Sequence, residues 1–170
     1  MGTEVCGLLL GGKDVGEKMA KELGAYGADK VLVCESDLLE TYTTDAYAKV
    51  LCDTVMAKKP EILLIAATNI GRDLGPRCAA RLHTGLTADC TQLEIGDFPI
   101  NPVPGREQLH NQLLMTRPAF GGNTIATIAC PNFRPQMATV RPGVMQKLPR
   151  EAGRKAEIEE FNPGFVPNEK

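Results

Sequence analysis

Three short apolar runs, separated by segments of helical periodicity, constrain the fold more than any other feature of this chain. The runs are Val5–Leu10, Lys30–Cys34 and Ile62–Ala67. Each is about as long as one strand and carries apolar residues at consecutive positions, which is typical of a strand covered on both faces. Strands and helices that alternate in this way predict a three-layer α/β/α fold around a mainly parallel sheet.

The intervening segments carry the signals of helix starts and ends. Apolar side chains recur every three or four residues in Val15–Tyr26, in Thr43–Lys59 and in Leu74–Leu82. Gly27 ends the first predicted helix and Pro60 ends the second, because glycine accepts the left-handed backbone after a helix and proline cannot continue one. The order strand, helix, strand, helix, strand, helix follows from the N-terminus to residue 82.

The pattern changes after residue 85. The segments predicted to be strands are Thr87–Ile95, Leu113–Arg117, Thr124–Cys130 and Gln136–Arg141, with a loop rich in proline and glycine at 96–105. Consecutive strands with short connections predict antiparallel strands added at one edge of the sheet.

The domain organisation follows from the same change in composition. Residues 1–150 are expected to form one α/β domain. Residues 151–170 are charged and contain prolines, so a linker or tail is expected there, with a further strand beginning at Ile158 as the alternative.

Composition excludes several functional classes. A net charge of −2 does not favour a partner that is a nucleic acid or an anionic membrane, and no apolar run reaches membrane-spanning length. The chain opens without the basic and apolar segments of a secretory signal, so a cytoplasmic protein is expected. Its six cysteines form no Cys-x-x-Cys pair and its two histidines lack a partner at metal-ligand spacing, which predicts buried free thiols and no metal site.

The third predicted helix carries a stripe of charged residues. Asp73, Arg77 and Arg81 are four residues apart and therefore share one face. Arg77 and Arg81 repel each other unless an anion or a carboxylate lies between them. The stripe therefore binds a phosphate or the acidic surface of a partner, or else its arginines pair within the domain with Asp73, Asp89 or Glu94.

Two further functions remain open from the residues alone. The loop Thr68–Asp73 follows a strand and opens a helix, so it could hold the phosphates of an adenine nucleotide in a stand-alone binding module. Its single glycine before the helix, and the lack of a Gly-x-Gly-x-x-Gly or Walker pattern, weaken that interpretation. A thiol-redox protein using Cys78 or Cys90 is the other alternative, although the carboxylate of Asp89 raises the pKa of the adjacent thiol.

Three sequence blocks resemble one known family when they are taken together. They are Gly71–Thr91, Arg117–Asn123 and Arg134–Val144, and they are similar to the amino-terminal domain of electron-transfer flavoprotein alpha subunits. The segment Asn101–His110 resembles anaerobic bacterial members, some of which work beside acyl-CoA dehydrogenases and bifurcate electrons.

The resemblance implies a domain of the adenine-nucleotide α-hydrolase-like type. It also implies a heterodimer with a beta subunit, FAD as the electron carrier, and acyl-CoA dehydrogenase-type enzymes as partners. In this family the FAD-binding segments lie in a second, carboxy-terminal domain, so no FAD and no catalytic residue is expected within these 170 residues. The positions that match the family are candidates for a domain or subunit interface only: Arg72, Asp73, Arg77, Thr87, Asp89, Arg117 and Arg141.

The resemblance also implies an opening strand that this sequence lacks, because the chain begins at what would be the second strand of the family. A missing strand leaves unpaired backbone N–H and C=O groups at an edge of the sheet. We therefore expect self-association of the chain, or a strand donated by a neighbour.

Overall fold

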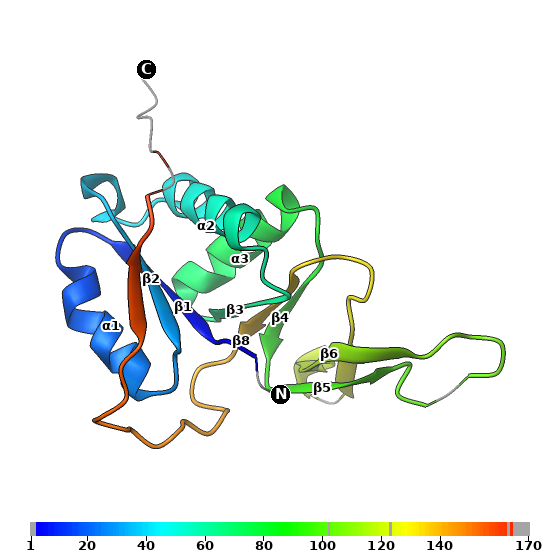
Figure 1. Ribbon diagram of the computed structural model, residues 1–170. Coiled ribbons are helices and arrows are strands. Elements are labelled where there is room, and N and C mark those ends of the chain that lie inside the picture. The colour runs from blue at the N-terminus through cyan, green and yellow to red at the C-terminus, as the bar shows by residue number, and fades with distance from the viewer. Residues whose placement is uncertain (1–2, 102, 123, 163, 165–170) are drawn as a thin grey trace. The chain divides into compact units, whose positions relative to one another are not determined.

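The computed structural model describes residues 3–101, 103–122, 124–162 and 164, and it divides into two compact units (Figure 1). The first unit comprises the described residues of Met1–Thr54 and Lys147–Lys170, and the second comprises those of Val55–Gln146. Helix α2 (Thr44–Lys58) begins in the first unit and ends in the second. The α/β class, with mainly parallel sheets and an antiparallel sheet, is confirmed, as expected for a three-layer α/β/α fold.

The first unit is built on a parallel sheet of three strands. These are β1 (Cys6–Gly11), β2 (Lys30–Glu35) and β9 (Glu157–Glu160), in the order β1-β2-β9. The central strand β2 is buried from Val31 to Cys34, as its apolar run predicts. The alternative of a strand near Ile158 is confirmed by β9, which pairs with β2 and is held by ion pairs from Lys30 to Glu157 and Glu159.

Helix α1 (Val15–Ala25) packs closely on this sheet (Figure 1). A Cβ atom at Gly16 would lie 2.5 Å from Cγ1 of Val33, so only glycine permits this approach. The backbone N–H of Gly16 donates to Oε1 of Glu35 at 2.8 Å, which satisfies a donor at the helix N-terminus. The chain leaves the helix through Gly27, at φ 111°, and a short 3-10 helix, η1 (Asp37–Leu39), follows β2.

The second unit contains a second parallel sheet, in the order β3-β8-β4. Its strands are β3 (Ile62–Ala66), β8 (Gln136–Val140) and β4 (Leu86–Cys90). The central strand β8 buries Gln136 through Thr139. Strand β3 pairs with β8 only among the described residues, and its Leu64 is 50% exposed. The predicted coverage of both faces of this apolar run is therefore wrong at Leu64, because β3 lies at an edge.

The antiparallel strands of the second unit form a sheet of their own. They are β5 (Gln92–Phe98), β6 (Leu109–Ala119) and β7 (Thr124–Ile128), with a short 3-10 helix, η2 (Phe120–Gly122), joining the last two. The glycines Gly121 and Gly122 adopt φ of 68° and 92°, a left-handed backbone that glycine accepts without strain.

Two predicted strands are wrong. The segment Gln136–Arg141 was expected among the antiparallel strands, but it forms β8, which runs parallel to both β3 and β4. The segment Thr87–Ile95 was expected to be continuous, but it is divided between β4 of the parallel sheet and β5 of the antiparallel sheet. The physical reason is the left-handed backbone of Asp89, at φ 62°, together with a shift in register between Thr87 and Cys90. A left-handed residue interrupts the pleat and turns the chain toward a different neighbour.

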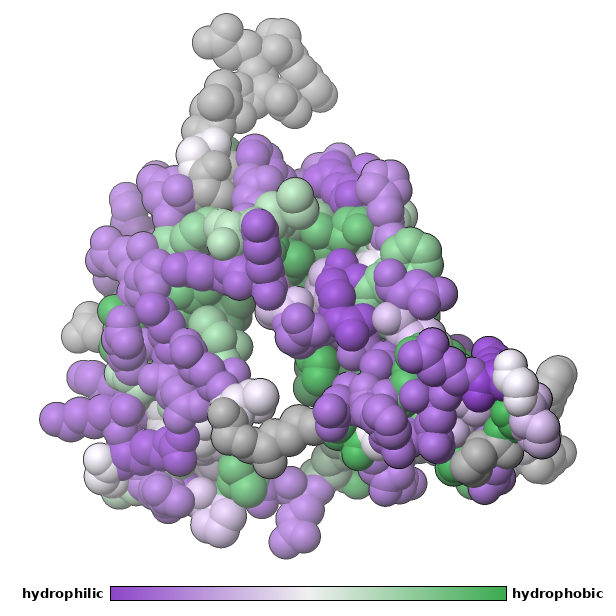
Figure 2. All heavy atoms as spheres, turned by 45° about the vertical axis from the view of Figure 1, so that its right-hand side comes forward, coloured by the Kyte–Doolittle hydropathy of each residue, from purple (hydrophilic) through white to green (hydrophobic). Residues whose placement is uncertain are grey.

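Hydrophilic residues predominate on the face drawn in Figure 2, and hydrophobic residues lie among them. None of the helices in the described parts of the chain combines the length and the apolar character that crossing a membrane requires. Within the same residues no group of three His, Cys, Asp or Glu side chains is arranged to hold a metal ion.

Candidate functional site

The candidate site is centred on Asp89, at the carboxyl end of β4. The left-handed backbone of Asp89 is stabilised by its own N–H, which donates to Oγ1 of Thr139 at 2.8 Å. Thr139 is 1% exposed and lies on the neighbouring strand β8. The position of the Asp89 carboxylate is therefore set by a hydrogen bond that connects two strands of one sheet.

Arg141 is the first residue after β8 and binds this carboxylate with both arms of its guanidinium group. Nε donates to Oδ1 at 3.1 Å and Nη2 donates to Oδ2 at 2.6 Å. The backbone N–H of Arg141 also donates to the carbonyl oxygen of Cys90 at 2.9 Å, so the end of β8 is tied to the end of β4. A bidentate arrangement of this kind fixes orientation as well as charge.

Arg72, in the first turn of α3 (Asn69–Arg81), adds a third hydrogen bond to the same carboxylate. Its Nη2 donates to Oδ1 of Asp89 at 3.1 Å and its Nε donates to the carbonyl oxygen of Ala67 at 3.0 Å. The helix begins immediately after β3, where the hydroxyl of Thr68 accepts from the N–H of Gly71 at 3.2 Å.

Gly71 allows α3 to lie close to the end of β3. A Cβ atom at this position would lie 1.8 Å from the carbonyl oxygen of Ala66, which no side chain tolerates. This approach brings Arg72 within reach of Asp89. The glycine and the arginine that follow strand β3 in the sequence therefore have distinct structural roles. Gly71 permits the close approach of the helix, and Arg72 then reaches Asp89.

Four residues make up what we call the Asp89 cluster: Arg72, Asp89, Arg117 and Arg141. The hydrogen bond from Arg141 is the largest cause that holds the pKa of Asp89 below its ordinary value, and the charges of Arg141, Arg72 and Arg117 act in the same direction against partial burial. The pKa of Arg141 is raised by its hydrogen bond to Asp89. One carboxylate faces three guanidinium groups, so the cluster carries an excess of positive charge.

That excess charge is accessible from solvent. The side chains of Arg72 and Arg141 are 55% and 41% exposed, whereas that of Asp89 is 18% exposed. Arg117 lies on β6 and is half-buried, and its Nε is buried without a hydrogen-bond partner in the described structure. Buried donors of this kind are uncommon in proteins, so Arg117 is the member of the cluster whose polar groups are least satisfied.

The structure brings together some of the predicted interface residues and separates others. Arg72, Asp89 and Arg141 contact one another, and Arg117 lies close enough to influence the pKa of Asp89. Asp73 and Arg77 lie on the exposed side of α3, and the side chain of Thr87 is buried in β4.

Sequence reasoning missed Thr139, which positions Asp89. The only available signal was a threonine in the otherwise apolar core of the strand Gln136–Val140.

Cys78 and Cys90 do not have the environment of reactive thiols. Cys78 and Cys90 are each fully buried, and burial is the largest cause that raises the pKa of the Cys90 thiol. A buried thiol with a raised pKa is a poor nucleophile, because the thiolate is the reactive form. The thiol-redox alternative therefore receives no support from either residue.

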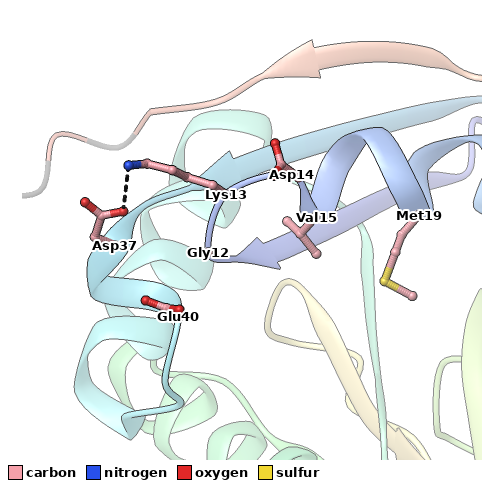
Figure 3. Close-up of a pocket in the computed structure, with 7 residues that line it drawn as sticks. All are labelled: Gly12, Lys13, Asp14, Val15, Met19, Asp37 and Glu40. Atoms are coloured by element: carbon pink, nitrogen blue, oxygen red, sulfur yellow. Dashed lines mark ion pairs between the residues drawn. The ribbon is translucent and has the colours of Figure 1, made fainter.

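A cavity of about 560 Å³ lies in the first unit, at the carboxyl end of β1 (Figure 3). Lys13 lines this cavity and pairs with Asp37 at 3.4 Å, and the side chains of Asp14 and Glu40 also line it. Three carboxylates and one ammonium group disfavour an anionic ligand.

Neither the cavity nor the start of α3 fits the pyrophosphate of FAD or of another nucleotide. At α3 the N–H of Gly71 is already bonded to Thr68, and Arg72 is bonded to Ala67 and Asp89. Neither of these two places therefore offers a cradle for a pyrophosphate, and the geometry at Thr68–Asp73 does not favour the nucleotide-binding alternative.

A comparison of the sequence with models of known protein families identifies the family of this chain. A family model described as "Electron transfer flavoprotein domain" matches residues 1–165. The chain belongs to the electron transfer flavoprotein family. The resemblance predicted from the three sequence blocks is thereby confirmed.

Curated relatives agree with this assignment. The chain is 59% identical over 160 residues to the acryloyl-CoA reductase electron transfer subunit beta of Anaerotignum propionicum. The aligned region covers 86% of this chain and 42% of that protein. It is 59% identical over 149 residues to the electron transfer flavoprotein subunit alpha of Clostridium acetobutylicum, covering 88% of this chain and 40% of the relative. It is also 46% identical over 133 residues to the lactate dehydrogenase (NAD(+),ferredoxin) subunit LctC of Acetobacterium woodii, covering 78% of this chain and 29% of that protein.

The chain thus spans about two fifths of the length of the first two relatives, and the matched part is amino-terminal in them. These relatives are named as electron transfer subunits.

Proposed function

We propose that this chain is the amino-terminal scaffold and docking domain of an electron-transfer flavoprotein alpha subunit. In this proposal residues 1–150 form the docking domain, and residues 151–170, which first add strand β9 to its sheet, lead toward a domain that holds FAD. The family match and the names of the relatives support the first part. The acidic lining of the β1 cavity supports the second part, because that cavity is not suited to the pyrophosphate of FAD.

The observation that carries the proposal is the Asp89 cluster. Hydrogen bonds hold Arg72 and Arg141 on the carboxylate of Asp89, the charge of Arg117 acts on the same carboxylate, and the exposed fractions of Arg72 and Arg141 leave positive charge at the surface. Such a surface fits a complementary acidic surface, since fixed arginines recognise carboxylates with defined geometry. We assign this role to Arg72, Arg117 and Arg141, with Asp73 and Arg77 on the same helix as Arg72, and no catalytic role to any of them.

The proposed occupant of this surface is an electron-transfer flavoprotein beta subunit. The assembled protein would then carry electrons by means of FAD for acyl-CoA dehydrogenase-type enzymes, in keeping with the relative named for acryloyl-CoA reductase. We place this activity in the cytoplasm and expect no nucleic-acid partner, given the net charge of −2.

The test is a titration of this chain with the beta subunit from the same organism. Calorimetry measures the binding affinity at two salt concentrations. Arg72→Gln removes one exposed charge but keeps a side chain that can donate a hydrogen bond to Asp89. We expect at least about fivefold weaker binding and a smaller dependence on salt, because a charge pair across an interface loses strength in salt.

A matched variant, Lys13→Gln, removes an exposed charge from the first unit. It should bind the beta subunit as the unaltered chain does. Equal affinities for the Arg72→Gln variant and the unaltered chain at low salt would contradict the assignment of the docking surface.

A further inference from the structure

The Asp89 cluster contains more hydrogen-bond donors than its carboxylate can accept. Oδ1 of Asp89 accepts from Arg72 and from Arg141, and Oδ2 accepts a second hydrogen bond from Arg141. A carboxylate offers about four acceptor positions, so one position at most remains. Nε of Arg117 does not use it, because this atom is buried and donates to no acceptor in the described residues. Arg117 is therefore the donor for which the cluster has no acceptor.

The course of the chain explains why Arg117 lies near Asp89. The backbone N–H of Thr91 donates to the carbonyl oxygen of Thr116 at 2.9 Å, which joins the residues after Asp89 to strand β6. Arg117 is the next residue of β6, whereas Arg141 reaches Asp89 from the end of β8. The two arginines therefore approach one carboxylate from strands of two different sheets within the second unit.

The state of Arg117 indicates that a partner group is missing. Its side chain is half-buried, so the guanidinium group has lost part of its hydration, yet Nε has gained no hydrogen bond in return. Such a loss is unfavourable for a charged group unless an anion compensates for it. The charges of Arg72 and Arg141 lie beside the same carboxylate and add to the positive potential there.

We propose that the Asp89 cluster binds one further carboxylate, which accepts hydrogen bonds from Arg117 and from the exposed guanidinium groups of Arg72 or Arg141. This inference rests on the proposed docking role, because it assigns the carboxylate to an aspartate or glutamate side chain of the beta subunit. It goes further in naming Arg117 as the contact on which recognition of that side chain depends.

A carboxylate suits this position better than a phosphate dianion. The planar guanidinium group presents parallel N–H groups that match the two oxygens of a carboxylate. Asp89 holds a negative charge at the centre of the cluster and would repel a dianion about twice as strongly as a monoanion at the same distance. With one added carboxylate, three guanidinium groups face two carboxylates, so the cluster stays attractive to the ligand.

Acetate is the probe for this site, and the 170-residue chain is titrated alone. Sodium acetate replaces sodium chloride at constant ionic strength, so that general screening does not change. Nuclear magnetic resonance follows the Nε–H signals of the arginines in isotope-labelled protein. The Arg117 signal should shift along a saturable curve in the millimolar range, since a lone carboxylate makes few contacts. The Arg134 signal should stay in place, because its Nε already donates to Glu61 at 2.6 Å.

Two variants test whether Arg117 is the residue responsible. Arg117→Met removes the guanidinium group, and because Nε has no hydrogen bond to lose, the variant should fold with an unchanged circular dichroism spectrum. Its affinity for acetate, read from the amide signals around Asp89, should fall at least about tenfold. Arg106→Met is the matched control, because Arg106 is an exposed arginine of the same unit and lies over the ring of Phe98. This control should bind acetate as the unaltered chain does.

Titration with the beta subunit identifies the source of the carboxylate. Binding of that subunit should shift the Arg117 Nε–H signal in the same direction as acetate does, and acetate should weaken the binding competitively. Binding of the beta subunit without a change at Arg117 would overturn the assignment of the carboxylate to that partner.

The remaining outcomes separate this inference from the proposed function. A linear response to acetate, an equal shift at Arg134, or an equal loss of affinity in Arg117→Met and Arg106→Met would overturn the carboxylate site, even if the beta subunit binds the chain. Saturable acetate binding at Arg117 in a chain that does not bind the beta subunit would instead overturn the docking role, and with it the assigned source of the carboxylate.

Discussion

Replacing Asp89 by asparagine isolates the contribution of the carboxylate charge to stability. Asparagine has nearly the same shape and tolerates the left-handed backbone that Asp89 adopts at φ 62°. The substitution therefore leaves the turn in place and weakens three hydrogen bonds, two from Arg141 and one from Arg72. A hydrogen bond to a charged group contributes roughly 1.5–3 kcal/mol.

Exposure of the two arginines reduces this contribution. Because about half of each guanidinium-bearing side chain is in contact with water, solvent screens the pair, and we expect the variant to lose about 1–2 kcal/mol of unfolding free energy. For a chain of this length that corresponds to a decrease in melting temperature of about 2–8 °C.

The pH dependence of this loss has a definite sign. The pKa of Asp89 is lower in the folded chain than in the unfolded chain, mainly because of the hydrogen bond from Arg141. The stabilisation is therefore fully present above the unfolded-state pKa and is lost as the pH falls through the lowered folded-state pKa. Urea unfolding followed by circular dichroism should show the full difference near neutral pH and a progressively smaller difference at acid pH.

Glu61→Gln is the matched control for Asp89→Asn. Glu61 accepts a hydrogen bond from Nε of Arg134 at 2.6 Å, but its side chain is 77% exposed. Exposed ion pairs contribute little to stability, so this variant should lose much less than Asp89→Asn. The reasoning is refuted if Asp89→Asn is as stable as the unaltered chain near neutral pH, or if its deficit does not change with pH.

Two further predictions concern packing and the thiols. Gly71→Ala should lower the unfolding free energy by about 3 kcal/mol or more, because the new Cβ atom meets the carbonyl oxygen of Ala66. Gly153→Ala is the control: a Cβ atom there meets open space, so the variant should be nearly neutral in the same urea titration. Brief alkylation of the folded chain, analysed by peptide mass spectrometry, should label exposed Cys6 at least about tenfold faster than buried Cys90. The reason is that burial shields the Cys90 thiol and raises its pKa. Similar labelling rates would contradict the assignment of Cys90 as an inert core residue.

The alternation of strands and helices was predictable because it depends on local composition. The apolar run of β2 indicates a buried strand, and β2 is central in its sheet. The run of β3 is equally apolar, yet β3 lies at an edge with Leu64 half exposed. Composition gives the tendency of a run to be covered, but the partners that cover it are decided by the order of strands, which depends on residues far away in the sequence.

The site was predictable only as a set of unconnected positions. Arg72, Asp89 and Arg141 each matched the family pattern, but the contact between Asp89 and Arg141 spans 52 residues of sequence and arises because β8 lies beside β4. The turn at Asp89 was also hidden, because a left-handed aspartate resembles any polar residue within a strand. Its cause is the hydroxyl of Thr139, which becomes a partner only when the sheet forms.

The central claim is that this chain docks other parts of a flavoprotein without binding the flavin itself. Equilibrium dialysis of FAD against the purified chain, with flavin absorbance read on both sides of the membrane, tests this most directly. The account predicts equal total FAD on the two sides and a colourless protein. Retention of one FAD per chain would contradict it.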